Sequence, residues 1–424
     1  MNRREFVTAA SSLLVVKPST VFGYQTNSIV RHGLLGCGSR GTAVASSFAS
    51  NTSAQVVALA DLFADKLATG RDHFNQLNTK LGHDPIAEAQ LFHGPEAFLA
   101  LAHSPAVDLI QISTPPFFHV QHLEAAVAAG KHVYCEKPVG IDIKQAHHAL
   151  EIAKRVKPGQ SVAVGFQCRN APPLAEVARR IQSGALGHIA AVSGHYYAPA
   201  STEKKREGEG PDEYRLRNWL WDRALSGDIL VEQNIHIIDL ANWMLSSHPV
   251  KASATASRAV LNHFGNCSDN YQVTYVYEAP SGGNPIHFSF ASTQFGSYGF
   301  FDAGLQFFGS EASATAPYSG PVAITGANAW EWKDAAASSQ QSAKFAADGA
   351  FQDNLQFADR DKERAVIDSI VSGHALNEIP AGVDTALSCM LGRMAAYTGH
   401  TVTWDELLAH GETYELGFDL RQFA

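Results

Sequence analysis

GLLGCGSRG, residues 33–41, is the stretch from which the fold of this chain is read first. Its glycines stand in the spacing G-x-G-x-x-G, and the motif consists of Gly36, Cys37, Gly38, Ser39, Arg40 and Gly41. The apolar residues before the motif predict the end of a β-strand, and residues 42–48 after it predict a helix. Such a turn lets the backbone approach a pyrophosphate, while the helix N-terminus offers free N–H groups and a positive dipole end. The stretch therefore predicts a site for a dinucleotide.

An acidic residue stands where a dinucleotide site needs one. Asp61 ends the next apolar run, residues 55–60, and lies 23 residues beyond Gly38. A carboxylate at the end of a second strand accepts hydrogen bonds from a ribose 2′-hydroxyl and repels a 2′-phosphate. This favours NAD over NADP as the cofactor. Arg40 keeps NADP open, because a guanidinium could hold a 2′-phosphate.

The pattern of the chain changes after about Phe166. Before it, short apolar runs alternate with amphipathic stretches, which predicts βαβ units in a doubly wound parallel sheet. After it, one helical stretch is followed by many alternating runs separated by Gly and Ser turns. We therefore expect an α/β protein with a Rossmann dinucleotide-binding domain over residues 28–160 and a C-terminal α/β (α+β) domain over residues 161–424. The second domain should hold a large open, mainly antiparallel or mixed sheet, and its helical tail, about 365–400, should pack back on the first.

Composition and charge exclude several classes of function. The 424 residues are 45% hydrophobic and 17% charged, as expected for a globular protein with a substantial core. The formal net charge is -9 and no basic face is visible, so binding to nucleic acid is not expected. No segment is apolar over the roughly 20 residues that a bilayer span requires. Five scattered cysteines without a C-x-x-C pair give no sign of a disulfide framework or a zinc knuckle.

The first 27 residues have the features of an export signal. Arg3 and Arg4 form a twin-arginine pattern and are followed by an apolar stretch, residues 6–16. We expect residues 1–27 to direct twin-arginine export to the periplasm or beyond; if this leader does not function, the protein is cytoplasmic. Twin-arginine export carries proteins already folded, and its usual rationale is a cofactor that must be loaded inside the cell. A tightly bound dinucleotide is therefore expected.

Two further motifs follow strand-like runs in the first half of the chain. The first is Thr114-Pro115-Pro116 with His119 behind it, and the second is Glu136-Lys137-Pro138. In parallel sheets, ligands bind outside the carboxyl ends of the strands, so both motifs are candidates for the site. Taken alone, the first also fits a proline turn with a surface histidine, and the second also fits an exposed, salt-bridged loop.

Residues 228–244 read DILVEQNIHIIDLANWM and predict a buried helix, because the stretch is apolar almost all round. Glu232, His236 and Asp239 nevertheless share one face of that helix, at spacings of four and three residues. Burial of unpaired charge is costly, so this polar stripe is expected to line a cleft. A satisfied core histidine with a capping acid is the structural alternative. A metal site is the other chemical alternative, but a third ligand is missing, so no metal is expected.

Together these motifs resemble the Gfo/Idh/MocA oxidoreductases. The resemblance runs from Gly33 to Gly399, and the E-K-P segment and the acid-x-x-x-His helix are its specific parts. Thr403–Asp405 and Asp269–Tyr271 are also typical of secreted bacterial members. The resemblance implies a Rossmann domain and an open-sheet domain whose sheet face often joins subunits, and hence a homodimer or homotetramer. The chain departs from the family at one point, because the family usually has Asp four residues before the histidine where this chain has Glu232. The departure bears on which substrate is preferred.

The resemblance also implies roles for the site residues. Lys137 and His236 would flank the nicotinamide and the substrate hydroxyl, and with Glu232 they form the expected catalytic set. The expected cofactor contacts are Gly36, Gly38, Ser39, Arg40, Gly41, Asp61, Thr114, Pro115, His119, Glu136 and Lys137. The expected substrate contacts are Gln167, Arg169, Tyr196 and Asp239, although these positions fit packing as well.

Three functions fit these residues. In the first, an NAD-dependent sugar or polyol dehydrogenase, His236 takes the hydroxyl proton while hydride passes from the carbinol carbon to nicotinamide, and Lys137 stabilises the charge that develops on oxygen. The second is redox-neutral: an NAD-dependent glycosidase, or a sugar–sugar oxidoreductase, with a tightly bound cofactor. The third is a non-catalytic protein that binds NAD or sugar. A small carbohydrate is the expected substrate of the first two.

Overall fold

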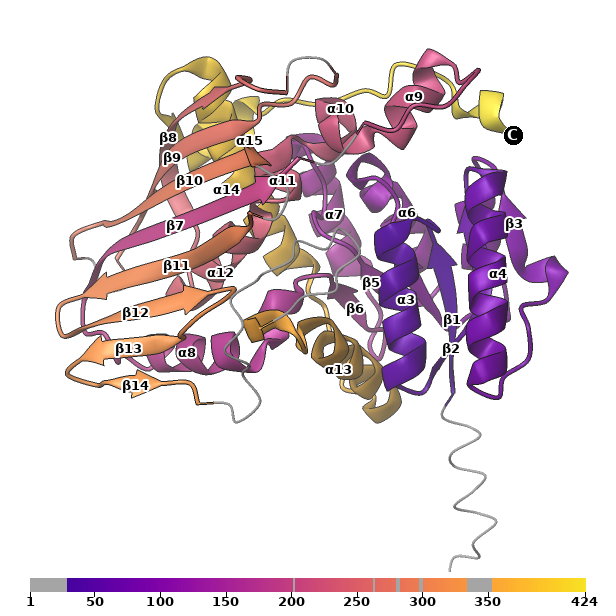
Figure 1. Cartoon of the computed structure of the whole chain (residues 1–424), viewed down its shortest axis with the longest axis horizontal. Coiled ribbons are helices and arrows are strands. Elements are labelled where there is room, and N and C mark those ends of the chain that lie inside the picture. Colours follow the sequence, from indigo (N-terminus) through magenta and orange to yellow (C-terminus); the bar gives the residue numbers. More distant parts are fainter. Residues whose placement is uncertain (1–28, 201–202, 262–263, 280–282, 297–299, 334–352) are drawn as a thin grey trace, which may run out of the picture.

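The computed structural model describes residues 29–424 apart from residues 201–202, 262–263, 280–282, 297–299 and 334–352. The expected export signal, residues 1–27, lies outside the described residues. Two α/β units stand side by side, and each carries one sheet (Figure 1). Among the described helices, none combines the length and the apolar character that a bilayer span requires.

The first unit is built on six parallel strands in the order β3-β2-β1-β4-β5-β6. The strands are β1 (Val30–Leu35), β2 (Ala54–Asp61), β3 (Leu91–His93), β4 (Leu109–Ile112), β5 (His132–Cys135) and β6 (Val162–Val164). This is the strand order of the dinucleotide-binding fold, in which the strand order reverses between β1 and β4 and leaves a crevice at the carboxyl ends. The expected Rossmann domain is confirmed.

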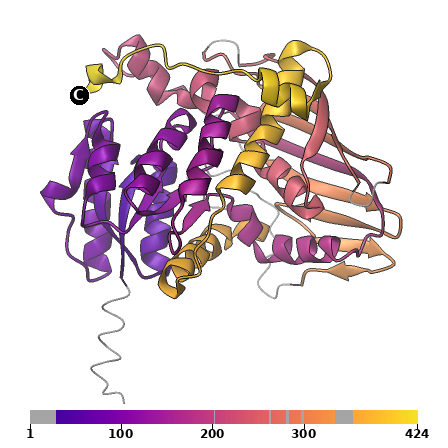
Figure 2. The ribbon, with the colours of Figure 1, turned by 180° about the vertical axis from the view of Figure 1, so that it is seen from behind.

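Helices cover both faces of this sheet, as Figure 2 shows from behind. One face carries α3 (Ser39–Asn51) and α4 (Ala64–Lys80), and the other carries α5 (Ala97–His103), α6 (His119–Ala128) and α7 (Ile143–Arg155). Along β2, Val56 and Leu59 pack on the first face while Ala58 and Ala60 pack on the second. Both faces are therefore buried, which is why these strands read as continuous apolar runs.

The second unit holds a nine-stranded sheet in the order β14-β13-β12-β11-β7-β10-β9-β8-β15. Its strands are β7 (Ile189–Pro199), β8 (Pro249–Ser257), β9 (Asn270–Tyr277), β10 (Ile286–Gly296), β11 (Asp302–Gly309), β12 (Ala312–Pro317), β13 (Ala323–Gly326), β14 (Trp330–Glu331) and β15 (Val402–Thr403). β7 and β10 run parallel, and every other neighbouring pair runs antiparallel. The expected large mixed sheet is confirmed.

The last long helices of the chain contact both units. The helices after the first sheet are α8 (Pro172–Gln182), α9 (Pro211–Arg217), α10 (Arg223–Ser226), α11 (Ile229–Glu232), α12 (Ile235–Leu245), α13 (Ala358–Ser372), α14 (Ile379–Thr398) and α15 (Trp404–His410). α13 packs on α3, and α14 packs on both α7 and β8. The approach of α14 is close, because a Cβ on Gly382 would lie 2.9 Å from the Val139 side chain. The carboxyl ends of the first sheet therefore face helices of the second unit.

One expectation about local structure is wrong. Residues 228–244 form two helices, α11 and α12, rather than one. Asn234 donates its backbone N–H to Ile229, five residues back, and Ile237 donates to Asn234, three residues back, so the regular four-residue ladder is interrupted. The side-chain amide of Asn234 makes no hydrogen bond in the described structure, so the interruption lies in the backbone alone. Glu232 and Asp239 consequently meet different partners.

Candidate active site

The glycine turn between β1 and α3 leaves an open cradle at the carboxyl end of the first strand. Gly36 has a φ of 95°, and a Cβ there would lie 2.6 Å from the Ser113 carbonyl oxygen, so a side chain is excluded. A Cβ on Gly38 would instead meet nothing within 4 Å. α3 begins at this point without a side-chain cap. An exposed backbone at an uncapped helix start is the arrangement that holds a pyrophosphate, so the turn fits a dinucleotide.

Asp61 fastens this turn to the end of β2. Its carboxylate accepts the backbone N–H of Cys37 at 2.7 Å and that of Phe63 at 2.8 Å. Burial raises the pKa of Asp61, and the two N–H groups oppose that shift by stabilising the charged form. An ionised carboxylate has about four lone-pair directions, so acceptor capacity remains for ribose hydroxyls. The residue therefore shapes the turn and still offers an acceptor beside it.

Arg40 points from the turn towards the second motif and not towards Asp61. Its Nε donates to Glu136 at 2.9 Å, and Nη1 and Nη2 each donate to Asp359 at 2.8 Å. All three guanidinium nitrogens are thus engaged by carboxylates. Asp359 lies in the first turn of α13 and belongs to no motif that the sequence singled out. The ion pairs join the glycine turn, the E-K-P segment and a helix from the far end of the chain.

His119 is buried between the two motif loops and is not a surface histidine. Its Nδ1 lies 2.8 Å from the Pro138 carbonyl oxygen, and its Nε2 lies 2.7 Å from the Thr114 carbonyl oxygen. Burial lowers the pKa of His119 to about 4, so the ring is neutral near pH 7. The imidazole therefore packs between the loop after β4 and the loop after β5 and donates its single N–H to one of the two carbonyl oxygens.

Lys137 reaches across from the first unit to α11. Its Nζ donates to Glu232 Oε1 at 2.7 Å and to the Glu232 carbonyl oxygen at 2.5 Å. The two side chains are 11% and 10% exposed, so the pair is largely buried. The exposed, salt-bridged loop that the sequence left open is therefore not what forms. The ammonium keeps one N–H direction that neither contact uses.

His236, in the first turn of α12, stands close enough to Lys137 and Arg40 for their charges to act on it. Burial and these two cations hold the pKa of His236 well below its usual 6.5. Its Nδ1 has no hydrogen-bond partner in the described structure. A neutral imidazole can take a proton from a substrate placed beside it.

Asp239 lies one helical turn further along α12 and is fully buried. Its carboxylate receives Arg169 at 2.8 and 2.5 Å and the Thr385 hydroxyl at 3.0 Å. The Arg169 guanidinium also lies over the rings of Phe166 and Trp243. Asp239 therefore offers no exposed surface to a substrate, and its observed contacts hold Arg169.

Other polar groups near the site are buried without partners. Of the remaining predicted substrate contacts, Gln167 and Tyr196 are 2% and 5% exposed, and the Gln167 Oε1 has no hydrogen bond in the described structure. The Oε1 of Gln233 and both amide atoms of Asn234 share this property, although sequence analysis did not select them. An unsatisfied buried amide costs about 1–3 kcal/mol unless water or a ligand satisfies it. The polar Gln-Asn pair between Glu232 and His236 was the signal that could have revealed them.

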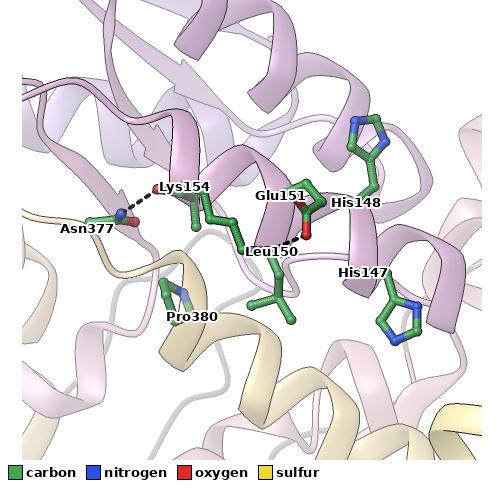
Figure 3. A pocket seen from close by; sticks show the side chains of 8 residues that line it. His147, His148, Leu150, Glu151, Lys154, Asn377 and Pro380 are labelled. Carbon is green, nitrogen blue, oxygen red and sulfur yellow. Dashed lines mark hydrogen bonds and ion pairs between the residues drawn. The ribbon is translucent and has the colours of Figure 1, made fainter.

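A hollow on the described surface lies away from these residues. Figure 3 shows it on the outer side of α7, where His147, Glu151 and Lys154 face Asn377 and Pro380 near the start of α14. None of the predicted site residues lines it. Over the described parts of the chain, no three His, Cys, Asp or Glu side chains gather as a metal ion would require. The candidate site is therefore the convergence of Lys137, Glu232 and His236 beside the glycine turn.

Comparison with known proteins agrees with this geometry. Residues 30–166 match the model of the oxidoreductase family with NAD-binding Rossmann fold (GFO_IDH_MocA), and residues 174–315 match the GFO/IDH/MocA C-terminal domain. Inositol 2-dehydrogenase of Rhizobium meliloti is 27% identical over 297 residues, which are 70% of this chain and 78% of that protein.

Solved structures share the whole two-domain architecture. Aldose–aldose oxidoreductase from Caulobacter crescentus, complexed with glycerol, superposes with a TM-score of 0.66 at 20% identity, covering 88% of this chain and 99% of that one. Levoglucosan dehydrogenase in complex with NADH and levoglucosan gives a TM-score of 0.65 at 16% identity, with the same coverage of 88% and 99%. At these identities the likeness is one of fold.

Proposed function

The chain belongs to the Gfo/Idh/MocA oxidoreductase family, an NAD-binding family that includes sugar and polyol dehydrogenases, and from this premise we propose that it oxidises a hydroxyl group of a sugar or polyol with NAD. The observation that carries the proposal is the convergence of Lys137, Glu232 and His236. These side chains come from both units and meet beside the glycine turn. Their chemistry suits the removal of one proton from an alcohol.

The residues divide the work of oxidation among them. NAD, when bound, supplies the nicotinamide carbon that accepts hydride from the carbinol carbon. His236 takes the hydroxyl proton, because its imidazole is neutral. Lys137 donates a hydrogen bond to the same oxygen and stabilises the negative charge that develops there. Glu232 holds the ammonium in position through two contacts.

The preference for NAD over NADP is supported at two residues. Asp61 stands at the end of β2 with its carboxylate beside the turn, where it would repel a 2′-phosphate. Arg40, the residue that kept NADP open, is engaged by Glu136 and Asp359 and lies on the other side of the turn. The Arg40 guanidinium is therefore already paired and does not face a 2′-phosphate.

The direct test is a panel of inositols, aldoses and anhydrosugars incubated with the purified protein and NAD while absorbance at the NADH band is followed. Formation of NADH with at least one sugar or polyol is the expected result. Binding of NAD should be measured separately by calorimetry. A chain that binds no dinucleotide, or that binds it and oxidises no member of a broad panel, would contradict the proposal.

A redox-neutral reaction is the second candidate, and the expected export signal favours it. An enzyme outside the cytoplasm cannot rely on free NAD, so a retained cofactor that passes hydride from one sugar to another avoids exchange. The structural likeness to an aldose–aldose oxidoreductase is consistent with this candidate. Two sugars supplied together would then give one oxidised and one reduced product without net NADH. Release of sugar from glycosides without net NADH would instead indicate the glycosidase version.

We also propose that the outer face of the nine-stranded sheet joins two copies of the chain. Gln306, Ser193, Ser289 and Thr274 lie side by side across β11, β7, β10 and β9, and all four are exposed, small or neutral side chains. Light scattering after size-exclusion chromatography should report a dimer or tetramer. Ser289→Glu places a charge in the middle of this row and should yield monomers, whereas an unchanged mass would argue against this face.

Export through the twin-arginine route remains a proposal that a fractionation experiment can test. The full chain should appear in the periplasmic fraction, and the double substitution Arg3→Lys and Arg4→Lys should leave it in the cytoplasm. Equal distribution of both forms would contradict export by this signal.

A further inference from the structure

The adenosine end of the cofactor site lies on the β2 side of the glycine turn. In this fold the carboxylate that ends β2 marks the ribose, so Asp61 marks it here. Beyond Asp61, the chain presents Leu62 and Phe63, and the loop after β4 presents Phe117 and Phe118. These apolar side chains belong to one cluster, and Phe117 also packs against the main core. The cluster therefore borders the place where an adenine base would lie.

The C-terminal segment, residues 411–424, completes this cluster from the outside. After α15 the chain runs back over α10 and α9 towards the first unit and ends near β3 and α4 (Figures 1 and 2). Leu416, Phe418 and Leu420 alternate with exposed residues along it and pack into the same cluster as Phe63. The Phe423 ring meets the Phe63 ring edge-on, with centroids 5.7 Å apart.

Hydrogen bonds fasten the segment along its length. The Tyr414 N–H donates to Asp142 at 2.9 Å, next to the loop that carries Lys137. Arg215 of α9 donates to the Leu416 carbonyl oxygen at 3.2 Å, and its guanidinium lies over the Phe418 ring. Gln422 donates to Asp212, also of α9, at 3.1 Å. The segment is therefore bound to both units rather than resting on one.

α9 also contacts the first unit at Phe63 and Asp65. The Arg217 guanidinium lies 3.8 Å from the centre of the Phe63 ring and pairs with Asp65 at 2.9 Å. Phe63 is thus covered by an arginine of the second unit on its face and by Phe423 at its edge. The terminal Ala424 reaches Gly94, whose N–H donates to the Asp61 carbonyl oxygen at 3.1 Å. The segment therefore ends near the backbone that follows Asp61.

We propose that residues 411–424 form an outer wall of the adenosine subsite and slow the release of the dinucleotide. This inference rests on the proposed function, because it assigns a role to residues around an NAD site. The wall lies outside residues 30–166 and 174–315, which the two family models match. The family match therefore does not assign it a role. A wall that must open before the adenine leaves lengthens residence without adding contacts to the nicotinamide.

The test compares release of NAD from four forms of the full protein. These are the unmodified chain, a chain ending at Gly411, Phe423→Ala, and Arg421→Ala as the matched control. Arg421 lies in the same segment, but its side chain is 81% exposed and its ion-pair partner is Asp419, a neighbour within that segment. Each form is loaded with labelled NAD and chased with an excess of unlabelled NAD. The truncated chain and Phe423→Ala should release the label about tenfold faster or more, and Arg421→Ala should match the unmodified chain.

The outcomes separate the wall from its premise. Equal release rates in all forms that bind NAD would overturn the wall and leave the proposed function standing. Tighter binding after truncation, with faster association only, would mean that the segment occupies the site itself, and it would also overturn the wall. Absence of NAD binding in the unmodified chain would overturn both. Phe423→Ala keeps the test decisive if the truncated chain fails to fold.

Discussion

The Nζ of Lys137, at the carboxyl end of β5, lies 2.7 Å from Oε1 of Glu232, at the end of α11. The two residues are 95 positions apart in the sequence, and each belongs to a different unit of the molecule. Because both side chains are largely buried, each fixes where the other stands. The reactive amine is therefore in place only when the two units are correctly docked.

Loss of the Glu232 charge should impair chemistry more than cofactor binding. In Glu232→Gln the ammonium keeps a hydrogen-bond partner but loses its counter-charge, so turnover should fall about 10- to 100-fold. The dissociation constant for NAD should stay within about twofold, because the observed partner of Glu232 is Lys137 and not the glycine turn. Steady-state kinetics and calorimetry measure the two effects. Glu232→Asp is the matched control, and an equal loss of NAD affinity would contradict the assigned role.

The acid limit of activity should lie below pH 6.5. Burial and the charges of Lys137 and Arg40 hold the pKa of His236 well below its usual 6.5, so the base stays unprotonated as the pH falls through that value. In Lys137→Gln one of the two cations is gone, and the pKa of His236 should rise. NMR titration of the imidazole follows this shift without requiring an active enzyme. A pKa that is unchanged in the variant would show that the two groups do not interact.

Stability should decline in acid for a reason specific to buried histidines. Burial lowers the pKa of His32 to about 3, of His119 to about 4 and of His122 to about 3. Below pH 6.5 the unfolded chain binds these protons and the folded chain does not, so each histidine costs about 1.4 kcal/mol per pH unit until its folded pKa is reached. Burial raises the pKa of Glu363 to about 8, so the folded chain holds a proton there that the unfolded chain lacks. This carboxyl group therefore stabilises the folded chain as the pH falls.

Urea unfolding at a series of pH values measures this dependence. Between pH 6 and 4.5 the free energy of unfolding should fall as the pH falls, with the histidines outweighing Glu363. His32→Leu removes the proton that His32 binds in the unfolded chain. The slope of the unfolding free energy against pH should therefore fall by about 1.4 kcal/mol per pH unit. An identical slope in that variant would mean that His32 is protonated in the folded chain.

Arg393 should prove necessary for turnover although it is remote from the reacting groups. Its Nη1 donates to the carbonyl oxygens of Ile141 at 2.9 Å and Gly227 at 2.8 Å, and the residue is 2% exposed. These carbonyls lie four residues after Lys137 and five before Glu232, so one nitrogen ties the two reactive segments together. Arg393→Met should lower turnover about tenfold and reduce the melting temperature, since it leaves two carbonyls unpaired.

Arg393→Lys is the companion variant, because its single ammonium keeps the charge and reaches the carbonyls less completely. It should fall between the unmodified chain and Arg393→Met in turnover, with NAD affinity unchanged in both. Full turnover in Arg393→Met would remove Arg393 from the positioning of the site.

Asp61 should govern the choice between the two dinucleotides. Asp61→Asn keeps an acceptor for the Cys37 N–H but removes the charge that would repel a 2′-phosphate. The ratio of kcat/KM for NAD to that for NADP should fall about tenfold, which corresponds to about 1.4 kcal/mol. A ratio that is unaffected would place the selectivity elsewhere.

Local patterns were sufficient for the elements that form from neighbouring residues. The glycine turn follows from the need for a backbone without Cβ at Gly36, and this requirement is visible in nine consecutive letters. The buried parallel strands follow from continuous apolar runs, because helices cover both faces. The same patterns did not predict the break between α11 and α12 at Gln233 and Asn234. There, backbone hydrogen bonds to residues five and three positions back replace the regular four-residue spacing.

The sequence by itself thus determined the Rossmann unit, the mixed sheet and the candidates Lys137, Glu232 and His236, because each leaves a periodic or motif-like trace. Only the tertiary structure decided their partners. Arg40 meets Asp359 across 319 positions, and Phe63 meets Phe423 at the very end of the chain. Such contacts depend on how the two units dock, and docking is set by the summed packing of many side chains rather than by any pattern within one segment. The physical limit of the sequence is therefore the separation along the chain of groups that touch in space.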